Sequence, residues 1–131
     1  MMIPHSETLN IANQAFAAFA SGIAHGDWSA FLNWLSEDFT FWFPAGPYQG
    51  WNQGKDRASE FLHSVSRVFP QGLTLTIEQV TSNDTTVVFE VRSEGMMQSH
   101  AYQNQAAIAF DVKDGKICAY REYLGVIYQL K

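Results

Sequence analysis

The stretch that decides the fold reads HAYQNQAAIAFDVKDGKICAYREYL and spans residues 100–124. Apolar and polar residues alternate on both sides of Lys113-Asp114-Gly115-Lys116, and a period of two is typical of half-buried β-strands. The Asp-Gly pair favours a tight hairpin turn because both residues accept left-handed backbone conformations. The stretch therefore predicts an antiparallel hairpin, with one strand over 100–112 and the other from 117 to about 128.

The residues before this hairpin show the same alternation. Positions 73–78 alternate apolar with polar residues, and Ser82-Asn83-Asp84 is typical of a turn. Residues 85–94 then predict a second strand whose polar face carries Arg92 and Glu94. The second half of the chain is thus expected to form consecutive antiparallel strands.

The first half shows the helical period instead. Large apolar residues recur at intervals of three and four, which predicts a helix, in the set Leu9, Ala12, Phe16, Phe19 and Ile23. A short helix over 28–35, a strand over 39–43, a loop over 48–54 and a helix over 55–69 are expected to follow. This order predicts an α+β fold, with three N-terminal helices packed on one face of a largely antiparallel sheet.

Composition narrows the classes of function. The chain has 131 residues, with 8 basic and 13 acidic side chains and a formal charge of −5. Nucleic acids and anionic membranes require a basic surface, so neither is expected as a partner. The N-terminus shows no basic and apolar leader pattern and no long apolar run occurs, so a cytoplasmic protein is expected.

Cofactor and assembly expectations also follow from composition. The four histidines and the single Cys118 lack the spacing of metal ligands, and no glycine-rich phosphate loop is present, so we expect neither metal nor cofactor. Aromatic residues make up 15% of the chain. Such residues can fill a core, line a pocket for an apolar molecule or form a subunit interface, and we expect a homodimer.

Three stretches together resemble the SnoaL-like, nuclear-transport-factor-2-like superfamily. They are Gly26-Asp27-Trp28 with Leu35-Ser36-Glu37-Asp38-Phe39 and Pro44, then Tyr102-Gln103-Asn104 leading to Phe110, and Asp114-Gly115-Lys116-Ile117 followed by Arg121-Glu122-Tyr123. The resemblance covers about the whole chain and implies one domain over 1–131, shaped as a cone with an internal pocket and often homodimeric. This fold hosts isomerases, hydrolases, cyclases, dehydratases and binding proteins, so it does not define a function.

Comparison with two branches of the superfamily tests the chemistry. The steroid isomerase branch has a base and two oxyanion donors at positions that correspond to Phe43, Phe19 and approximately Ala106, none of which can do that work. The limonene-epoxide hydrolase branch has an Arg and two acids, which Arg92, Glu94 and Glu122 match. Its water-positioning residues correspond to Phe41 and about Phe43, so half of that water site is missing.

These matches make Glu122, Arg92 and Glu94 the catalytic candidates, but the residues allow other interpretations. Periodicity alone places Arg92 and Glu94 on a solvated polar face, and Glu122 either lines the pocket or forms an ion pair at the surface or an interface. The ligand-binding candidates are polar residues of the strand from 100 and aromatic residues elsewhere, namely His100, Tyr102, Asn104, Trp51, Phe19, Trp34 and Phe43.

Each ligand-binding candidate also has a structural interpretation. Tyr102 and Asn104 can cap backbone groups, His100 can simply begin a strand, and most aromatic residues belong to the core. Three functions therefore stay open. The protein is a small-molecule enzyme of isomerase, dehydratase or hydrolase type, in which Glu122 is the acid-base group and Tyr102, Asn104 and Arg92 orient the substrate; or it is a binding or carrier module, or a protein-interaction domain.

Overall fold

The computed structural model describes residues 5–125. Three α-helices occur in this part of the chain: α1 (His5–His25), α2 (Ser29–Trp34) and α3 (Lys55–Val68). A short 3-10 turn, Gly46–Tyr48, links two of the six strands, which are β1 (Leu35–Phe43), β2 (Gly50–Gln53), β3 (Leu73–Ser82), β4 (Thr86–Met97), β5 (His100–Lys113) and β6 (Lys116–Leu124). The described residues therefore confirm the expected α+β class with helices early and strands late.

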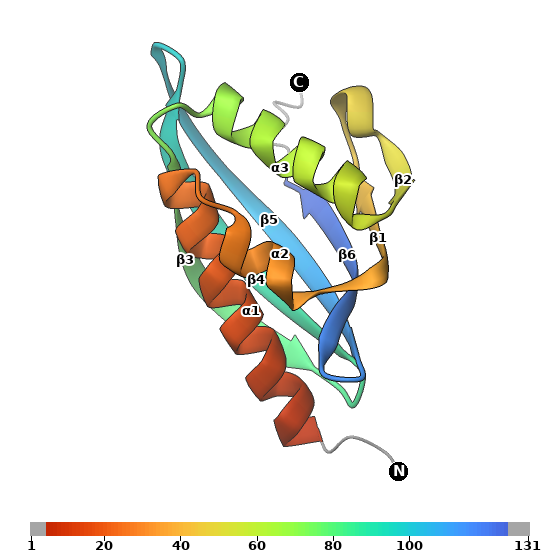
Figure 1. Cartoon of the computed structure of the whole chain (residues 1–131). Coiled ribbons are helices and arrows are strands. Elements are labelled where there is room, and N and C mark those ends of the chain that lie inside the picture. The colour runs from red at the N-terminus through yellow and green to blue at the C-terminus, as the bar shows by residue number, and fades with distance from the viewer. Residues whose placement is uncertain (1–4, 126–131) are drawn as a thin grey trace, which may run out of the picture.

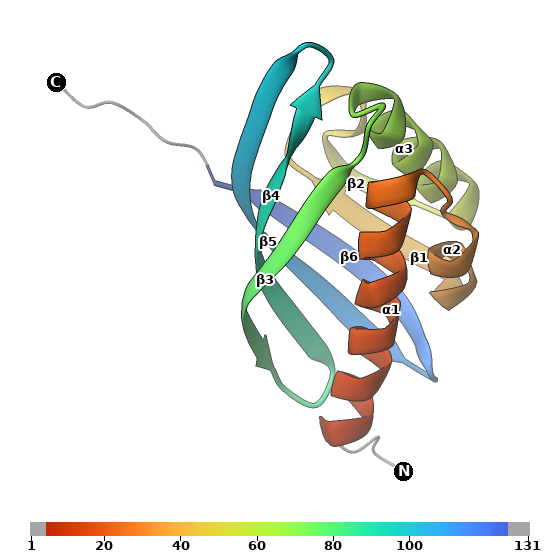
Figure 2. The ribbon, with the colours of Figure 1, turned by 90° about the vertical axis from the view of Figure 1, so that its left-hand side faces the viewer.

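The strands form one curved sheet in the order β2-β1-β6-β5-β4-β3. All neighbours are antiparallel except β1 and β6, which run parallel. The helices lie on one face of this sheet, as the side view in Figure 2 shows, while the overall arrangement is seen in Figure 1. We call the face that carries the helices the inner face and the opposite face the outer face.

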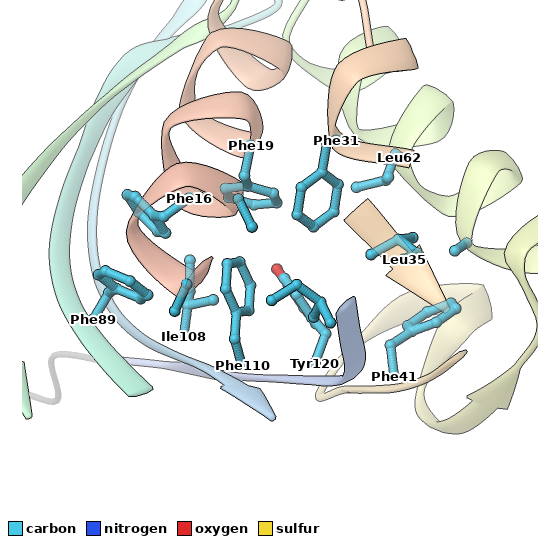
Figure 3. Close-up of a cluster of buried hydrophobic side chains, with 14 of the residues drawn as sticks. Phe16, Phe19, Phe31, Leu35, Phe41, Leu62, Phe89, Ile108, Phe110 and Tyr120 are labelled. Carbon is cyan, nitrogen blue, oxygen red and sulfur yellow. The ribbon is translucent and has the colours of Figure 1, made fainter. Parts of the chain in front are cut away.

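The core lies between the helices and the inner face (Figure 3). The helical stripe places Phe16 and Phe19 of α1 over the sheet, where both are buried. Phe16 stacks on Phe89 of β4, with ring centroids 4.3 Å apart, and Phe19 meets Tyr120 of β6 at 5.7 Å. Burial of these large rings is the main favourable contribution to folding, as in any core of this kind.

Trp28 connects helices α1 and α3. Its indole Nε1 donates a hydrogen bond to Ser66 Oγ of α3 at 2.9 Å. A Cβ atom at Gly22 of α1 would lie 2.5 Å from the Trp28 ring, so only glycine allows this close approach. The contact fixes α1 and α3 relative to each other, and both helices contribute to the cavity described below.

Two sequence expectations need correction. The region 48–54 is not a loop throughout, because Gly50–Gln53 forms strand β2 and pairs with β1. The sequence did not predict β2 because four residues on a sheet edge show no clear alternation of apolar and polar side chains. The alternation of apolar and polar residues over 73–78 also does not continue along β3. A bulge after Ile77 shifts the register with β4, so that Val80 pairs with Phe89. Ile77 itself stays 46% exposed on this edge strand.

The second half of the predicted hairpin also starts where expected. β6 begins at Lys116 and pairs with β5 through the Asp-Gly turn, in which Asp114 has φ 53°. The described part of β6 ends at Leu124, and the expected continuation to about Tyr128 lies outside the described residues.

Candidate functional site

A cavity of about 100 Å³ lies between the inner face of the sheet and the helices α1 and α3. Its wall is mostly apolar and includes residues from seven of the helices and strands and from the segments that join them. The lining residues are Phe19, Ile23, Trp28, Phe43, Phe61, Leu62, Val65, Phe69, Leu73, Leu75, Val91, Ser93, Tyr102, Ala106, Ile108, Tyr120, Glu122 and Leu124. An apolar hollow with a few polar groups is the usual form of a small-molecule site.

Strand β6 brings the one carboxylate of the lining into the cavity. Side chains alternate along a strand, so Tyr120, Glu122 and Leu124 face inward while Arg121 and Tyr123 face outward. The Tyr120 hydroxyl donates a hydrogen bond to Glu122 Oε1. This bond places the carboxylate at the junction of the core and the cavity.

Burial changes the ionisation of both partners. Desolvation raises the pKa of Glu122 to about 7, although the hydrogen bond from Tyr120 partly counteracts it. Desolvation also raises the pKa of Tyr120 well above its ordinary value, and the neighbouring Glu122 charge adds to this effect. Tyr120 therefore remains a hydrogen-bond donor, while Glu122 exchanges a proton near neutral pH.

No lysine, arginine or histidine is among the residues that line the cavity. Tyr102, Tyr120 and Glu122 are its ionisable groups. Within residues 5–125 the structure records no ion pair to Glu122, and its Oε2 has no hydrogen bond from the protein. Desolvation therefore raises the pKa of Glu122 without a cation among these described residues to offset it.

A second group of polar atoms lies toward the β4–β5 end of the cavity. Asn104 Nδ2 donates a hydrogen bond to the Tyr102 hydroxyl at 3.0 Å, and the Tyr102 ring meets Phe69 at 4.8 Å. Ser93, which is buried, donates from its Oγ to the Asn104 carbonyl at 3.4 Å. These residues can orient a polar end of a ligand.

The structure does not bring Arg92 and Glu94 to Glu122. Both side chains lie on the outer face, where Arg92 Nε donates to Glu94 Oε1 at 2.8 Å and Arg92 Nη1 lies 3.3 Å from Glu78 Oε2. The expectation that the three residues form one catalytic group is therefore corrected. The physical reason is the strand period. Val91 and Ser93, on either side of Arg92, face the cavity, so Arg92 and Glu94 face the opposite way.

The predicted ligand-binding residues divide into two groups. Phe19, Phe43 and Tyr102 line the cavity, and Asn104 supports Tyr102 from the same strand. His100, Trp51 and Trp34 are not among the lining residues: His100 is exposed at the start of β5, Trp51 is 63% exposed on β2, and Trp34 packs against the core.

Sequence reasoning missed the contribution of α3 and the role of Tyr120. The α3 residues Phe61, Leu62 and Val65 have the spacing of an apolar stripe, but a stripe does not distinguish a cavity wall from a filled core. Tyr120 was detectable in principle, since a residue two positions before Glu122 on a strand shares its face.

Two other kinds of site find no support in the part of the chain that the structure describes. No three side chains of the His, Cys, Asp or Glu type come together within residues 5–125 in a way that could hold a metal ion. None of the helices there has the length and apolar character that crossing a membrane requires.

A helical layer on a curved mixed sheet, with an apolar cavity between them, defines a cone-shaped α+β protein. The chain belongs to the family of SnoaL-like domains, whose pattern matches residues 15–120. An NTF2-like protein from Anabaena variabilis has a similar crystal structure, with a TM-score of 0.91 and 49% sequence identity over 97% of this chain and 96% of that one. A comparison with curated proteins finds no match.

More distant structures share the fold alone. A protein from Jannaschia that is provisionally described as a SnoaL-like polyketide cyclase is 17% identical, with a TM-score of 0.78 over 92% of this chain and 86% of that one. An LEH-like epoxide hydrolase from M. tuberculosis is 18% identical, with a TM-score of 0.70 over 92% of this chain and 84% of that one. The family is thus established, whereas the chemistry must be inferred from the site.

Proposed function

We propose that the protein takes a small, mostly apolar molecule into the cavity and that Glu122 gives a proton to it or takes one from it. The observation that carries this proposal is the Glu122 carboxylate, hydrogen bonded by Tyr120 in an apolar cavity without a counter-charge. A group with a pKa of about 7 populates its acid and base forms in similar amounts at neutral pH. This is the condition under which one residue serves general acid-base catalysis best.

The reaction types that suit this site are isomerisation, dehydration and hydrolysis of a small metabolite. Each requires a proton to leave or reach a carbon or oxygen atom of the substrate, and Glu122 is the group that can carry it. Tyr120 holds the carboxyl group in place through its hydroxyl. Tyr102 and Asn104 orient the other end of the substrate from the β5 side of the cavity.

The test begins with ligand discovery by NMR on the full chain, followed by turnover assays on the small molecules that bind. We expect Glu122→Gln to lower turnover by about 100-fold or more, which is the usual contribution of general acid-base catalysis. Glu94→Gln is the matched control, since Glu94 is a carboxylate of the same sheet on the outer face. Equal turnover in wild type and Glu122→Gln would contradict the proposed role.

Binding without chemistry is the second candidate function. It is favoured by the rings of Phe43 and Phe19, which occupy the positions where the steroid isomerase branch has a base and a donor. A carrier would bind its ligand reversibly and return it unchanged. Ligand binding without any turnover, across a panel of ketones, epoxides and alcohols that bind, would favour this function.

We also propose that the protein forms a homodimer through the outer face. Trp51 is 63% exposed there, and Tyr123, 49% exposed, stacks on Trp42 with ring centroids 5.3 Å apart. Contiguous exposed aromatic rings are typical of interfaces. Sedimentation at micromolar concentration should give a dimer that Trp51→Glu weakens. A monomeric wild type would leave the face to a different protein partner, which is the interaction-domain alternative.

A further inference from the structure

The surroundings of Glu122 combine an unbalanced carboxylate with several aromatic rings. Phe43 lies one residue beyond the Trp42–Arg121 pair of the parallel strands β1 and β6, which brings it beside Glu122. The Phe43 ring meets Phe61 of α3 at 4.8 Å, and both line the cavity. The Tyr120 ring completes this wall next to Phe19. The carboxylate thus shares the cavity with several aromatic rings.

The unbalanced carboxylate and the aromatic rings together favour a positively charged ligand. Aromatic faces attract cations through the ring quadrupole, most strongly where water is excluded. The ionised Glu122 carboxylate is stabilised by a positive partner, and none of the residues that line the cavity supplies one. An anionic ligand would meet Glu122 without any compensating cation. A neutral ligand can donate a hydrogen bond to Oε2 but leaves the charge of the ionised carboxylate unbalanced.

We propose that the natural ligand of the cavity is a small apolar amine, whose ammonium group pairs with the Glu122 carboxylate while its hydrocarbon part packs against Phe43 and Phe61. This inference rests on the proposed ligand-binding function of the cavity and adds the substrate class to it. It requires only that one N–H of the ligand reach the carboxylate oxygen that Tyr120 leaves unoccupied.

The proton balance of this pairing is closed. A protonated Glu122 that meets a neutral amine transfers its proton to the nitrogen, and an ionised Glu122 that meets an ammonium ion needs no transfer. Both routes give the same carboxylate–ammonium pair, whose net charge is zero. The ionisable groups that line the cavity beside the pair are Tyr102 of β5 and Tyr120 of β6, and the raised pKa of Tyr120 keeps its hydroxyl a donor.

The experiment compares three probes of similar size and shape: benzylamine, benzyl alcohol and benzoate. Binding of each to the full chain is measured by NMR chemical-shift titration of the methyl groups of Leu62 and Val65, which line the cavity. At pH 8 we expect benzylamine to bind at least about tenfold more tightly than benzyl alcohol, and benzoate to bind most weakly. This preference should disappear in Glu122→Gln and persist in the control Glu94→Gln.

A pH series on the wild type keeps the test independent of whether the variant folds. The affinity for benzylamine should weaken about tenfold for each pH unit below 7, because protonation of Glu122 then competes with the amine. The affinity for benzyl alcohol should change little over the same range.

The outcomes separate the two proposals. Benzyl alcohol binding as tightly as benzylamine, or a benzylamine affinity that does not depend on pH, would overturn the amine inference and leave the cavity a site for neutral molecules. If none of the three probes shifts the cavity methyl groups, both the amine inference and the proposed binding function fail.

Discussion

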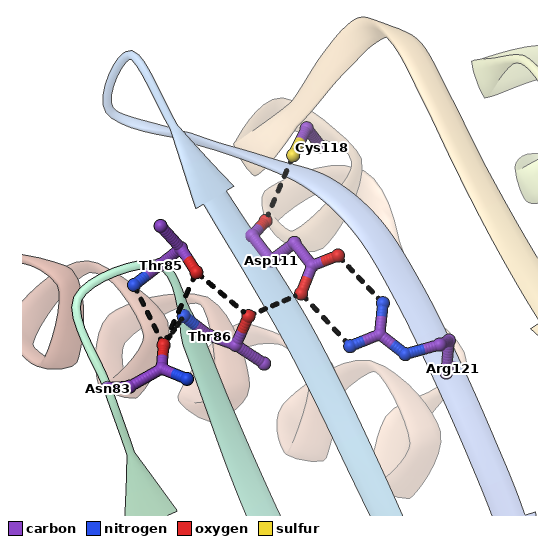
Figure 4. A network of polar contacts seen from close by, with 6 residues as sticks. All are labelled: Asn83, Thr85, Thr86, Asp111, Cys118 and Arg121. Carbon is purple, nitrogen blue, oxygen red and sulfur yellow. Dashed lines mark hydrogen bonds and ion pairs between the residues drawn. The ribbon is translucent and has the colours of Figure 1, made fainter.

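The inner and outer faces of the sheet each hold a partly covered carboxylate, and the two differ in every respect that matters for chemistry. On the outer face, Asp111 accepts two hydrogen bonds from Arg121, at 2.7 and 3.0 Å, and one from Thr86 Oγ1 at 2.7 Å (Figure 4). On the inner face, Glu122 accepts a single hydrogen bond, from Tyr120. Arg121 and Glu122 are adjacent in sequence and point to opposite faces.

The pKa values of the two groups diverge for this reason. Desolvation pushes the pKa of Asp111 upward, but the hydrogen bonds from Arg121 and Thr86 and the Arg121 charge outweigh it, so the pKa is lowered overall. Glu122 experiences desolvation without a cation, and its pKa rises to about 7. Desolvation therefore has two outcomes. Asp111, which has the Arg121 cation beside it, forms a structural ion pair, whereas Glu122, which has none, exchanges a proton near neutral pH.

The largest effect should come from breaking the outer-face pair. Arg121→Ala leaves the Asp111 carboxylate partly buried without its cation, and we expect the free energy of unfolding at pH 7 to fall by about 2–3 kcal/mol. The lowered pKa of Asp111 contributes stability at neutral pH that is lost as the pH falls through that pKa. The difference between variant and wild type should therefore shrink below about pH 4. Urea unfolding at pH 7 and pH 3 measures the free energy of unfolding of the variant and the wild type. The same difference between the two proteins at both pH values would contradict this explanation.

Removing the Glu122 charge from the inner face should raise the free energy of unfolding rather than lower it. The raised pKa of Glu122 means that the folded state holds a proton which the unfolded state has already lost between pH 4.5 and about 7. Stability of the wild type consequently falls as the pH rises through this range. Glu122→Gln should be more stable than wild type by about 2–3 kcal/mol at pH 8 and nearly equal to it at pH 4.5. Urea unfolding at the two pH values checks this, and a variant that is destabilised at pH 8 would contradict it.

A smaller effect should follow from Tyr120→Phe, which removes the single hydrogen bond to Glu122. Because that bond lowers the pKa of Glu122, its loss should move the midpoint of the Glu122 titration upward by about 1 pH unit. NMR titration of the carboxyl carbon reports the midpoint directly. The Asp111 carboxyl carbon, in the same spectra, should titrate as in the wild type.

The smallest effect is expected at the exposed charges of the outer face. Arg92 pairs with Glu94 and Glu78, but its side chain is 36% exposed and those of its partners more so. Such pairs are screened by solvent and contribute little, so Arg92→Ala should leave the free energy of unfolding close to that of the wild type. The same measurement on Arg121→Ala provides the contrast, and similar losses in both variants would remove the distinction between the two pairs.

Cys118 belongs to the same outer-face network and shows why a free thiol there is unreactive. Its Sγ donates to the Asp111 carbonyl at 3.5 Å, and burial, together with the Asp111 charge, raises the pKa of the thiol (Figure 4). The nucleophilic thiolate is therefore scarce at neutral pH.

Local sequence patterns determined most of the fold. The alternation on both sides of Asp114-Gly115 predicted the β5–β6 hairpin, because turn chemistry and side-chain period act between near neighbours. The stripe that carries Phe16 and Phe19 predicted the buried face of α1 for the same reason. Strand β2 was missed, since its pairing with β1 depends on a partner rather than on its own four residues.

Only the tertiary structure decided which residues form the site. The sequence marked Glu122 through a family resemblance, and it also marked Arg92 as its companion. The structure places Arg92 and Glu122 on opposite faces of the sheet, because each strand's register with its neighbours fixes which face every residue takes. The wall that Phe61 adds to the cavity arises from packing α3 against β1, and no local sequence pattern predicts it.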